Sequence, residues 1–451
     1  MKRSLLCLLL SLFFIFQTAG AQTEKESLDA SRERVEVAKI NQSIAVAVID
    51  EKGTRFFNFG KTNTTADAKK TDENTVFEIG SITKVFTGIL LAEAVKRGEV
   101  KLEEPVSKYL PGTVKMPSRN GREITLLDLS MHTSGLPSLP TNFKPADSNN
   151  PYADYTVQQM YEFLSGYTLT RDIGVQSSYS NFGVGLLGHV LALRAGSSYE
   201  DLVKTRILKP LGMKDTSITL SKEMRSRTAQ GFSADGDPVS LWDLPTMAGA
   251  GALRSTTKDM AKFIAANMHL TKTELAGSFD ASHKPRHDVS AKMKVGLGWH
   301  IMAGSTGEIV WHNGGTAGFR TFAGFSPILK RGIVILSNTS YSVDDLGFHS
   351  FDPQVPLAKV RQAVSVSEKL LEDYAGNYEL APTVLITVTR KLDRLFAQLT
   401  GQPSYRLYAE NESKFFLRVA DAQVTFNRGA DGKVESLTLH QGGDRVARRV
   451  K

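Results

Sequence analysis

The placement of strand-forming segments along residues 43–340 constrains the fold of this chain most strongly. An early hairpin has apolar residues on both sides of a turn at 50–53, and the other strand signals come late in this region. Between them, from 102 to 267, mostly helical segments alternate with Gly-, Pro- and Ser-rich loops. This order predicts an α/β fold, an α+β sandwich, in which both chain segments close one antiparallel sheet around an inserted helical subdomain. The strand signals cover residues 43–49, 55–59, 308–312, 319–325 and 332–337.

A second region follows a change in composition over residues 355–367, which we interpret as a linker. From Tyr374 onward, short segments with alternating apolar residues recur at regular spacing, with Gly and Asn between them. This pattern is typical of a small antiparallel β-barrel. We therefore predict one domain over residues 22–360 and a barrel domain over residues 368–451. The barrel signals cover residues 384–388, 395–399, 415–419, 424–426 and 434–439.

The first 21 residues have the pattern of a secretory signal peptide. Lys2 and Arg3 precede an apolar run from Leu5 to Phe16, and Ala19-Gly20-Ala21 provides a small-x-small cleavage site before the chain turns polar. The apolar run is shorter than the roughly 20 residues that a membrane-spanning helix needs. We expect residues 1–21 to be removed, no stable membrane span, and a mature protein that is periplasmic or secreted.

Composition argues against several classes of function. The chain carries one cysteine, Cys7, inside the predicted signal peptide, so the mature protein has neither a disulfide framework nor a cysteine nucleophile. The net charge of +8 is scattered rather than gathered into a basic stripe, which argues against a nucleic-acid partner. The nine histidines are dispersed, and neither His-Glu-x-x-His nor a Gly-rich phosphate loop occurs, so neither a metallohydrolase nor a nucleotide enzyme is indicated.

Ser81 and Lys84 form a pattern that fits nucleophilic catalysis. Apolar residues recur at near-helical spacing from Ser81 to Arg97, and Gly98 stands where a C-cap belongs, so Ser81 begins a predicted helix. A serine hydroxyl needs a neighbouring base, and a lysine three residues later on a helix presents its amine on the same face. The helix N-terminus adds a dipole and free N–H groups that favour developing negative charge. The absence of a Gly-x-Ser-x-Gly sequence disfavours an α/β-hydrolase.

A second segment of the chain serves as a control for this spacing. Ser255-Thr256-Thr257-Lys258 repeats the Ser-x-x-Lys pattern, but Thr256 followed by Asp259 is typical of a helix capping box. We therefore interpret the second occurrence as structural.

The wider context of Ser81 resembles a known family. The run from Phe77 to Lys84 resembles the active-site signature of class C β-lactamases and related penicillin-recognising serine hydrolases, with Thr83 where these usually have Ser or Ala. Tyr179-Ser180-Asn181 resembles their Tyr-x-Asn element, which implies that the phenol moves a proton between nucleophile and leaving group and that Asn181 orients substrate and lysine. Because a phenol with a pKa of about 10 is no base at neutral pH, we expect neighbouring cations such as Lys84 to depress the pKa of Tyr179.

His312-Asn313-Gly314-Gly315, at the end of a predicted strand, resembles the third element of the family, Lys-Thr-Gly or a His-x-Gly variant. The resemblance implies that these four residues bind substrate along the strand edge and that the N–H groups of Gly315 and Ser81 form an oxyanion hole. A lysine is a permanent cation for a substrate carboxylate, whereas a histidine is charged part of the time near neutral pH. If protonated His312 holds the carboxylate, kcat/KM for anionic substrates falls as pH rises through its pKa.

The resemblance extends over residues 43–340 and implies a β-lactamase/transpeptidase-like fold. Softer echoes occur at His132–Pro137 and at Ala250–Thr256, which we interpret as structural loop markers. Residues 374–451 resemble the lipocalin-like barrel that some of these hydrolases carry at the C-terminus, and no site chemistry is evident there.

The resemblance implies an exported serine hydrolase that needs no metal or organic cofactor. Ser81 attacks an amide or ester carbonyl with help from Lys84 and Tyr179, and water then hydrolyses the acyl-enzyme with one of these two groups as base. The implied substrate is a β-lactam, an activity associated with antibiotic resistance. The alternatives are a D-amino-acid peptidase or carboxypeptidase and an esterase, so the partner is a small molecule or a peptide. From another class, a non-hydrolytic penicillin-binding or sensing module stays open.

Overall fold

The chain forms two compact units in the computed structural model. The first, called the sandwich unit below, runs to Ser233 and resumes over Pro238–Leu357. The second, called the barrel unit, comprises Ala234–Asp237 and the chain from Ala358 onward. The structure describes residues 22–402, 404–420 and 422–450.

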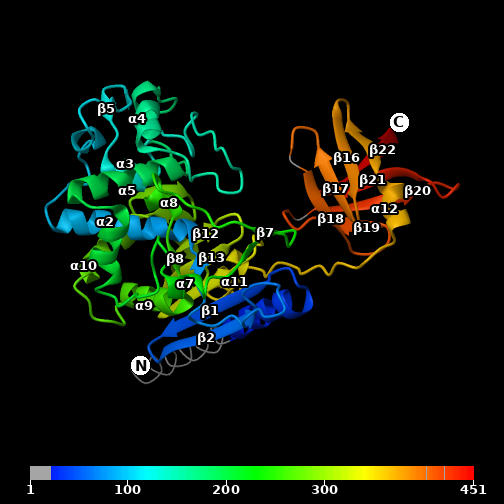
Figure 1. Cartoon of the computed structure of the whole chain (residues 1–451), viewed down its shortest axis with the longest axis horizontal. Coiled ribbons are helices and arrows are strands. Elements are labelled where there is room, and N and C mark those ends of the chain that lie inside the picture. Colours follow the sequence, from blue (N-terminus) through cyan, green and yellow to red (C-terminus); the bar gives the residue numbers. More distant parts are fainter. Residues whose placement is uncertain (1–21, 403, 421, 451) are drawn as a thin grey trace, which may run out of the picture. The chain divides into compact units, whose positions relative to one another are not determined.

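An eight-stranded sheet forms the centre of the sandwich unit (Figure 1). The strand order is β2-β1-β14-β13-β12-β11-β10-β9, and every neighbouring pair is antiparallel. β1 pairs with β14 from Ile44↔Ser337 to Ile49↔Gly332, which confirms the prediction of one sheet closed by both chain segments. The strands are β1 (Ser43–Asp50), β2 (Gly53–Gly60), β9 (His287–Ser290), β10 (Met293–Val295), β11 (His300–Gly304), β12 (Gly307–Gly315), β13 (Arg320–Ser326) and β14 (Arg331–Ser337).

Most helices of the sandwich unit come between β2 and β9 in the chain, as the predicted insertion requires. They are α2 (Thr83–Lys96), α3 (Leu126–Ser130), α4 (Val157–Gly166), α5 (Asn181–Ala195), α6 (Tyr199–Val203), α7 (Lys222–Arg225), α8 (Ala248–Gly251), α9 (Thr257–Asn267) and α10 (Ala276–His283), with the short turns η2 (Gly80–Ile82), η3 (Val106–Tyr109) and η4 (Lys204–Leu208). Helical residues 22–32, η1 (Glu33–Val37) and α11 (Asp344–His349) lie outside the insertion. Three two-stranded pairs complete the unit: β3 (Phe77–Glu78) with β8 (Arg254–Ser255), β4 (Ser118–Arg119) with β5 (Arg122–Glu123), and β6 (Gly231–Phe232) with β7 (Pro238–Val239).

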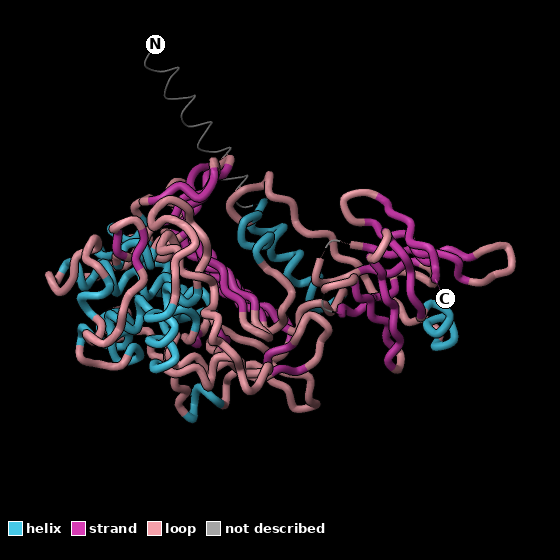
Figure 2. The backbone as a smooth tube through the Cα atoms, turned by 90° about the horizontal axis from the view of Figure 1, so that it is seen from above, coloured by secondary structure: helices cyan, strands magenta, loops and turns pink. Residues whose placement is uncertain are grey.

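Two apolar cores cover the two faces of the sheet. Ala45 and Ala47 of β1 belong to the larger core, together with residues of α2 and α9. Val46 and Val48 belong to the smaller core, together with residues of α11 and of the helical segment 22–32. Figure 2 shows helices on both sides of the strands. Because both faces of β1 are buried, its sequence is almost continuously apolar rather than alternating.

Helix α2 follows Ser81 directly and lies inside the sandwich unit, where it packs against α5 and α8 (Figure 1). Its residues from Thr83 to Ala94 are all buried, as is typical of a helix enclosed by other elements. Gly98 follows the helix with φ +69°, a left-handed conformation that glycine adopts without strain. The predicted helix from Ser81 to Arg97 is confirmed, and its first turn is the 3₁₀ turn η2.

The sequence analysis found no strand between the helical region and residue 308, and this expectation is wrong. Strands β9, β10 and β11 precede it at the edge of the sheet. β9 is mostly exposed and polar, so its sequence carries no alternation of apolar and polar residues. Edge strands of this kind are stabilised by backbone pairing, which leaves no mark in the side-chain pattern.

The barrel unit is a closed barrel of eight antiparallel strands, which confirms the predicted small β-barrel. Helix α12 (Glu368–Tyr374) brings the ring of Tyr374 onto that of Phe426, with centroids 4.0 Å apart, in the core of this unit. A likeness to lipocalins in particular stays a prediction. The strands are β15 (Gly376–Ala381), β16 (Val384–Lys391), β17 (Arg394–Leu399), β18 (Ser404–Ala409), β19 (Lys414–Phe416), β20 (Gln423–Arg428), β21 (Val434–His440) and β22 (Asp444–Val450).

No helix among residues 22–450 combines the length and the apolar content that a membrane crossing needs. The predicted signal peptide, residues 1–21, lies outside the described part of the chain.

Candidate active site

Ser81 lies in the short turn η2, where the chain passes under the end of strand β12. A Cβ atom on Gly80 would lie 2.8 Å from the backbone N of Gly315, and one on Gly314 would lie 2.0 Å from the carbonyl O of Ile79. Both approaches are too close for any side chain, so glycine is required on each side of the contact. This packing places the backbone of Gly315 beside the nucleophile candidate.

The amine of Lys84 is the centre of the polar cluster. Its Nζ lies 3.0 Å from Ser81 Oγ, 2.8 Å from Asn181 Oδ1 and 2.6 Å from the carbonyl O of Ala250. The side chain is 1% exposed, and this burial holds the pKa of Lys84 well below its usual value of 10.5. Nζ donates to all three oxygens. In its neutral form the amine would keep two N–H groups for the amide and the carbonyl, and its lone pair could take the proton of the serine hydroxyl.

Tyr179 contacts the same serine from another side. Its hydroxyl donates a hydrogen bond of 2.6 Å to Ser81 Oγ, and the Nζ of Lys84 lies 4.9 Å from the centre of its ring. Loss of solvation raises the pKa of Tyr179 to about 12. The expectation that Lys84 depresses this pKa is wrong, because the loss of solvation outweighs the hydrogen bond to Ser81, the one influence that lowers it.

The start of α5 holds Tyr179 and Asn181 in place. Ser180 is the N-cap of this helix, and its Oγ accepts a hydrogen bond of 2.8 Å from the N–H of Gly183. The N–H of Ser180 donates to Nδ1 of His132 at 3.1 Å, and the His132 ring lies 4.7 Å from that of Tyr179. The Tyr-x-Asn element is therefore fixed by a helix cap and by a loop histidine.

His312 points into the same cluster but is neutral. It is 1% exposed, and its Nδ1 donates to the carbonyl O of Asn313 at 2.5 Å. Burial, and then the neighbouring His300 and Lys84, hold the pKa of His312 well below 6.5. Burial therefore disfavours the protonated form of His312 at neutral pH, which is the form that could hold a carboxylate by charge.

Asn313 lies on the opposite face of β12 from His312, since successive side chains of a strand alternate. Its Nδ2 donates to Oδ2 of Asp344 in α11 at 2.8 Å. The side chain thus ties β12 to α11 and points away from the Ser81 cluster. Ser81, Lys84, Tyr179, Asn181, His312, Gly314 and Gly315 are brought together as the sequence analysis expected.

Three further groups at this site were not singled out as functional from the sequence. His132 and the carbonyl of Ala250 lie in the two segments that were interpreted as structural loop markers. The resemblance of these segments to the family could therefore have marked both groups as part of the site. His300 stacks on His312 with ring centroids 4.8 Å apart, and burial lowers its pKa to about 4. His300 belongs to β11, a strand that the sequence did not predict, and no motif marks it.

The second Ser-x-x-Lys segment is structural. Thr256 Oγ1 accepts a hydrogen bond of 3.1 Å from the N–H of Asp259 and caps α9. Lys258 Nζ binds Asn74 Oδ1 at 3.3 Å, and Ser255 Oγ shares a hydrogen bond of 2.7 Å with Thr216 Oγ1. The cap at Thr256 is confirmed, but Asp259 does not close a capping box, because its Oδ2 accepts from the N–H of Asp215 at 2.7 Å.

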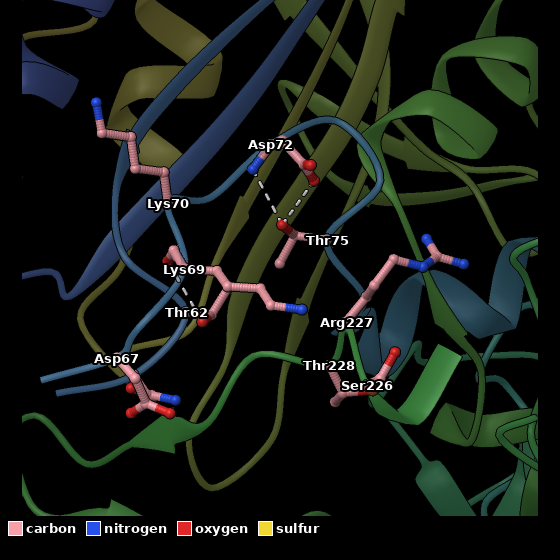
Figure 3. Close-up of a pocket in the computed structure, with 10 residues that line it drawn as sticks. Thr62, Asp67, Lys69, Lys70, Asp72, Thr75, Ser226, Arg227 and Thr228 are labelled. Carbon is pink, nitrogen blue, oxygen red and sulfur yellow. Dashed lines mark hydrogen bonds between the residues drawn. The ribbon is translucent and has the colours of Figure 1, made fainter. Parts of the chain in front are cut away.

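A pocket of about 240 Å³ lies elsewhere in the sandwich unit (Figure 3). It is formed by the loop after β2 and by the residues that follow α7, and it shares no lining residue with the Ser81 cluster. Within the described ranges, no three His, Cys, Asp or Glu side chains gather closely enough to hold a metal ion.

The arrangement around Ser81 belongs to a known class of proteins. The family model described as Beta-lactamase matches residues 32–349. The chain belongs to the β-lactamase family. A β-lactamase of Pseudomonas fluorescens is 31% identical over 332 residues, which are 66% of this chain and 88% of that protein. The D-alanyl-D-alanine-carboxypeptidase/endopeptidase AmpH of Escherichia coli (strain K12) is 29% identical over 315 residues, 66% of this chain and 79% of that protein.

The fold of this β-lactamase-family chain is that of solved class C enzymes. A class C β-lactamase structure superposes with a TM-score of 0.64 at 23% identity, over 74% of this chain and 97% of that one. The family resemblance carried by Phe77–Lys84 is thus confirmed, and the chain is a serine hydrolase of the β-lactamase fold. A second family model, described as a domain of unknown function (DUF3471), matches residues 360–448, which include the barrel.

Proposed function

We propose that this serine hydrolase forms an acyl-enzyme at Ser81 and hydrolyses β-lactam amides, as a class C-like β-lactamase does. One observation carries the proposal: the buried amine of Lys84 touches Ser81 Oγ, Asn181 Oδ1 and the carbonyl O of Ala250 together. The oxygens of Asn181 and Ala250 can only accept hydrogen bonds, so they occupy both N–H groups of the neutral amine. The lone pair of the amine can then accept the proton of Ser81.

Acylation then follows from this geometry. Lys84 takes the proton of Ser81 as Oγ attacks the carbonyl carbon, and desolvation of the amine makes it a base at neutral pH. The N–H groups of Ser81 and Gly315 hold the negative oxygen of the tetrahedral intermediate. His312, Gly314 and the side-chain amide of Asn181 line the space that the substrate occupies.

Tyr179 serves as the proton donor to the leaving group. A phenol with a pKa of about 12 keeps its proton at neutral pH, and its hydroxyl already points at Ser81 Oγ. When the C–N bond breaks, Tyr179 gives its proton to the nitrogen and regains one from the Lys84 ammonium, since both groups bind the same oxygen. A water molecule then attacks the acyl-enzyme with Lys84 as its base, and Ser81 leaves with the proton.

A D-alanine carboxypeptidase is the second candidate. AmpH of Escherichia coli carries that activity in its name, and this chain has a neutral histidine at 312 where the β-lactamase signature usually has a lysine cation. An esterase would use the same acyl-enzyme chemistry. A non-hydrolytic penicillin-binding or sensing module is the remaining alternative, and it would keep the acyl group on Ser81.

Intact-protein mass spectrometry with parallel turnover assays tests these assignments. The probes are a chromogenic cephalosporin, a D-alanyl-D-alanine peptide and a short acyl ester, with Ser81→Ala as the variant and Ser255→Ala as its matched control. We expect cephalosporin turnover that Ser81→Ala abolishes and Ser255→Ala retains. Turnover of the peptide alone moves the assignment to carboxypeptidase, turnover of the ester alone moves it to esterase, and a stable Ser81 adduct without turnover indicates a sensing module.

We also propose export, with residues 1–21 as a cleaved signal peptide, residues 22–360 as the hydrolase domain and residues 368–451 as the barrel domain. The basic start, the apolar run and the Ala19-Gly20-Ala21 site support the cleavage. The mass of the protein recovered from the periplasm or the culture medium tests it, because a mature chain begins at Gln22. A full-length mass in that fraction contradicts the proposal.

A further inference from the structure

Glu78 lies three residues before Ser81 and carries a buried carboxylate. It is 3% exposed and belongs to β3, where it pairs with Arg254 of β8. Its Oε1 accepts hydrogen bonds from the N–H of Trp242 at 2.8 Å and from Nη2 of Arg254 at 3.4 Å. Burial raises the pKa of this carboxyl, and the Arg254 guanidinium is the strongest influence that lowers it. Because burying a carboxylate costs free energy that an apolar side chain would not cost, packing alone does not account for this residue.

The second oxygen of the carboxylate and a nearby hydroxyl are both unpaired. Glu78 Oε2 and Thr316 Oγ1 are buried, and neither has a hydrogen-bond partner within the described part of the chain. The Thr316 hydroxyl is nevertheless one of the groups that lower the pKa of Glu78, so the two side chains lie within reach of each other. A hydroxyl can donate by rotating about its C–O bond, and a carboxylate oxygen can only accept. Each group satisfies the other when Thr316 donates to Glu78.

Thr316 directly follows the residue that gives the candidate oxyanion hole its second N–H. That residue is Gly315, the last of β12. A Cβ on Gly80 would lie 2.8 Å from the N of Gly315, so this end of the strand already packs on the turn of the nucleophile. A hydrogen bond from Thr316 to Glu78 would tie the strand end to the segment before Ser81. Both N–H groups of an oxyanion hole must lie about 3 Å from one oxygen, so this tie controls the geometry that matters.

Arg254 extends the network to a third segment of the site. It lies in β8, four residues after Ala250, whose carbonyl O accepts a hydrogen bond from Lys84. Its guanidinium also donates to two backbone carbonyl oxygens, at 2.6 and 2.7 Å, which makes it a rigid partner. The carboxylate of Glu78 therefore joins this segment to the two segments that form the candidate oxyanion hole.

We propose that Glu78 is a positioning residue for the oxyanion hole: it accepts a hydrogen bond from Thr316 and so holds the Gly315 N–H in place relative to Ser81. The inference rests on the proposed acyl-enzyme function and deepens it. In this scheme Glu78 touches no substrate atom and transfers no proton. It acts through the end of β12, so its contribution extends to every substrate that forms an oxyanion at Ser81.

Variants of matching size separate the roles of the two groups. Glu78→Met and Thr316→Val each remove one partner of the bond, whereas Thr316→Ser keeps the hydroxyl and Glu78→Gln can still bond it through the amide N–H. The matched control is Glu93→Met, near the C-terminal end of α2. Glu93 is 4% exposed and likewise binds an arginine, Arg97, at 2.8 Å and a hydroxyl, that of Ser278, at 2.7 Å.

Burst kinetics on the preferred substrate measure the acylation rate constant, and calorimetry in the Ser81→Ala background measures substrate affinity. We expect Thr316→Val and Glu78→Met to lower the acylation rate constant about 10- to 100-fold, because a misplaced N–H loses its bond to the oxyanion. Substrate affinity should change less than about threefold, and the double variant should lose no more than the worse single variant. Thr316→Ser and Glu78→Gln should keep most of the rate, and Glu93→Met should leave it unchanged.

Two results overturn the proposal. A full acylation rate in Thr316→Val does so even where Glu78→Met fails to fold. A loss in Thr316→Val that Thr316→Ser does not restore, or that Glu93→Met shares together with a lower Tm, indicates a structural role instead.

Phenylboronic acid separates this inference from the proposed function, because it probes the oxyanion hole without turnover. Its boron accepts the Ser81 oxygen and becomes tetrahedral and anionic, as the intermediate is. We expect Thr316→Val and Glu78→Met to weaken its binding about 10- to 100-fold. Such a loss in an enzyme that turns over no cephalosporin changes the proposed substrate and supports the inference. Equal affinity in wild type and both variants overturns the inference and leaves the acyl-enzyme chemistry of Ser81 intact.

Discussion

The sandwich unit contains two Ser-x-x-Lys segments whose surroundings are opposite. Ser81 is partly exposed, and Lys84, 1% exposed, has its Nζ 3.0 Å from Ser81 Oγ. Ser255 is 0% exposed, and Lys258 is exposed at the surface. A nucleophile must be reachable by substrate and its base must be desolvated. The first segment meets both conditions and the second meets neither.

The difference begins with the position of each serine relative to its helix. Ser81 lies in the turn that leads into α2, so a residue three positions later projects beside it. Ser255 ends strand β8, and the helix begins only after the N-cap Thr256. Spacing in the sequence therefore indicates a catalytic pair where both residues share one helical turn.

The largest contrast is expected from removing the two hydroxyls. Ser81→Ala should lower kcat/KM by about 10⁴-fold or more, because no nucleophile remains. Ser255→Ala should change kcat/KM by less than about threefold, because the Ser255 hydroxyl binds Thr216 and the carbonyl O of Thr256 rather than a group of the Ser81 cluster. Steady-state kinetics on the preferred substrate measure both. A comparable loss in both variants would remove the distinction between the segments.

The two lysines should differ next. Lys84→Met should lower kcat/KM about 10²- to 10⁴-fold, the usual contribution of a general base. Lys258→Met should be nearly neutral, since Lys258 is exposed and its amine makes one described hydrogen bond, to Asn74. Burst kinetics show whether acylation is the step that Lys84→Met slows. Near-full activity of Lys84→Met would assign the base to another group.

Tyr179 has no counterpart beside Ser255, and its removal should cost less than that of Lys84. Tyr179→Phe should lower kcat about 10²-fold on substrates with an amine leaving group, at the lower end of general acid catalysis. A better leaving group, such as a phenolate ester, should lose less, because it needs no proton. An equal loss on both leaving groups would indicate that the hydroxyl positions Ser81 rather than donates.

The smallest expected effect concerns pH. A base acts in its neutral form, so kcat/KM falls only as pH drops through the depressed pKa of Lys84. Up to about pH 10, the ordinary pKa of a free phenol, Tyr179 keeps its proton because its own pKa is about 12. His312 is neutral throughout, so preference for an anionic substrate should change less than about threefold from pH 5.5 to 8. A preference that is lost as pH rises through about 6.5 would restore His312 as the carboxylate group.

Much of the candidate site was predictable because its residues lie in ordered motifs. Phe77–Lys84, Tyr179–Asn181 and His312–Gly315 follow one another in the chain in the order that the family requires. The sequence analysis named the loops that contain His132 and Ala250 but interpreted them as structural. A backbone carbonyl and a histidine that accepts a hydrogen bond leave no recognisable sequence motif. His300 was missed because β11 is short and only Ile301 in it is buried, so its sequence shows little periodic pattern.

The strands of the fold also divide into those that the sequence predicts and those that it does not. The continuous apolar run of β1 predicted a buried strand, and the pairing of β1 with β14 followed from strands at both ends of the region. The polar strand β9 at the sheet edge was not predictable, because its pairing depends on backbone bonds to a neighbour rather than on its own side chains.

The sequence by itself determined which groups can react: a serine with a lysine one helical turn away, a phenol, an amide and glycines that permit close backbone contact. The tertiary structure decided their charge states. Burial by segments far apart in the chain lowers the pKa of Lys84 and of His312, while Tyr179, 40% exposed, keeps its proton. Desolvation depends on everything packed around a group, so no local pattern encodes it.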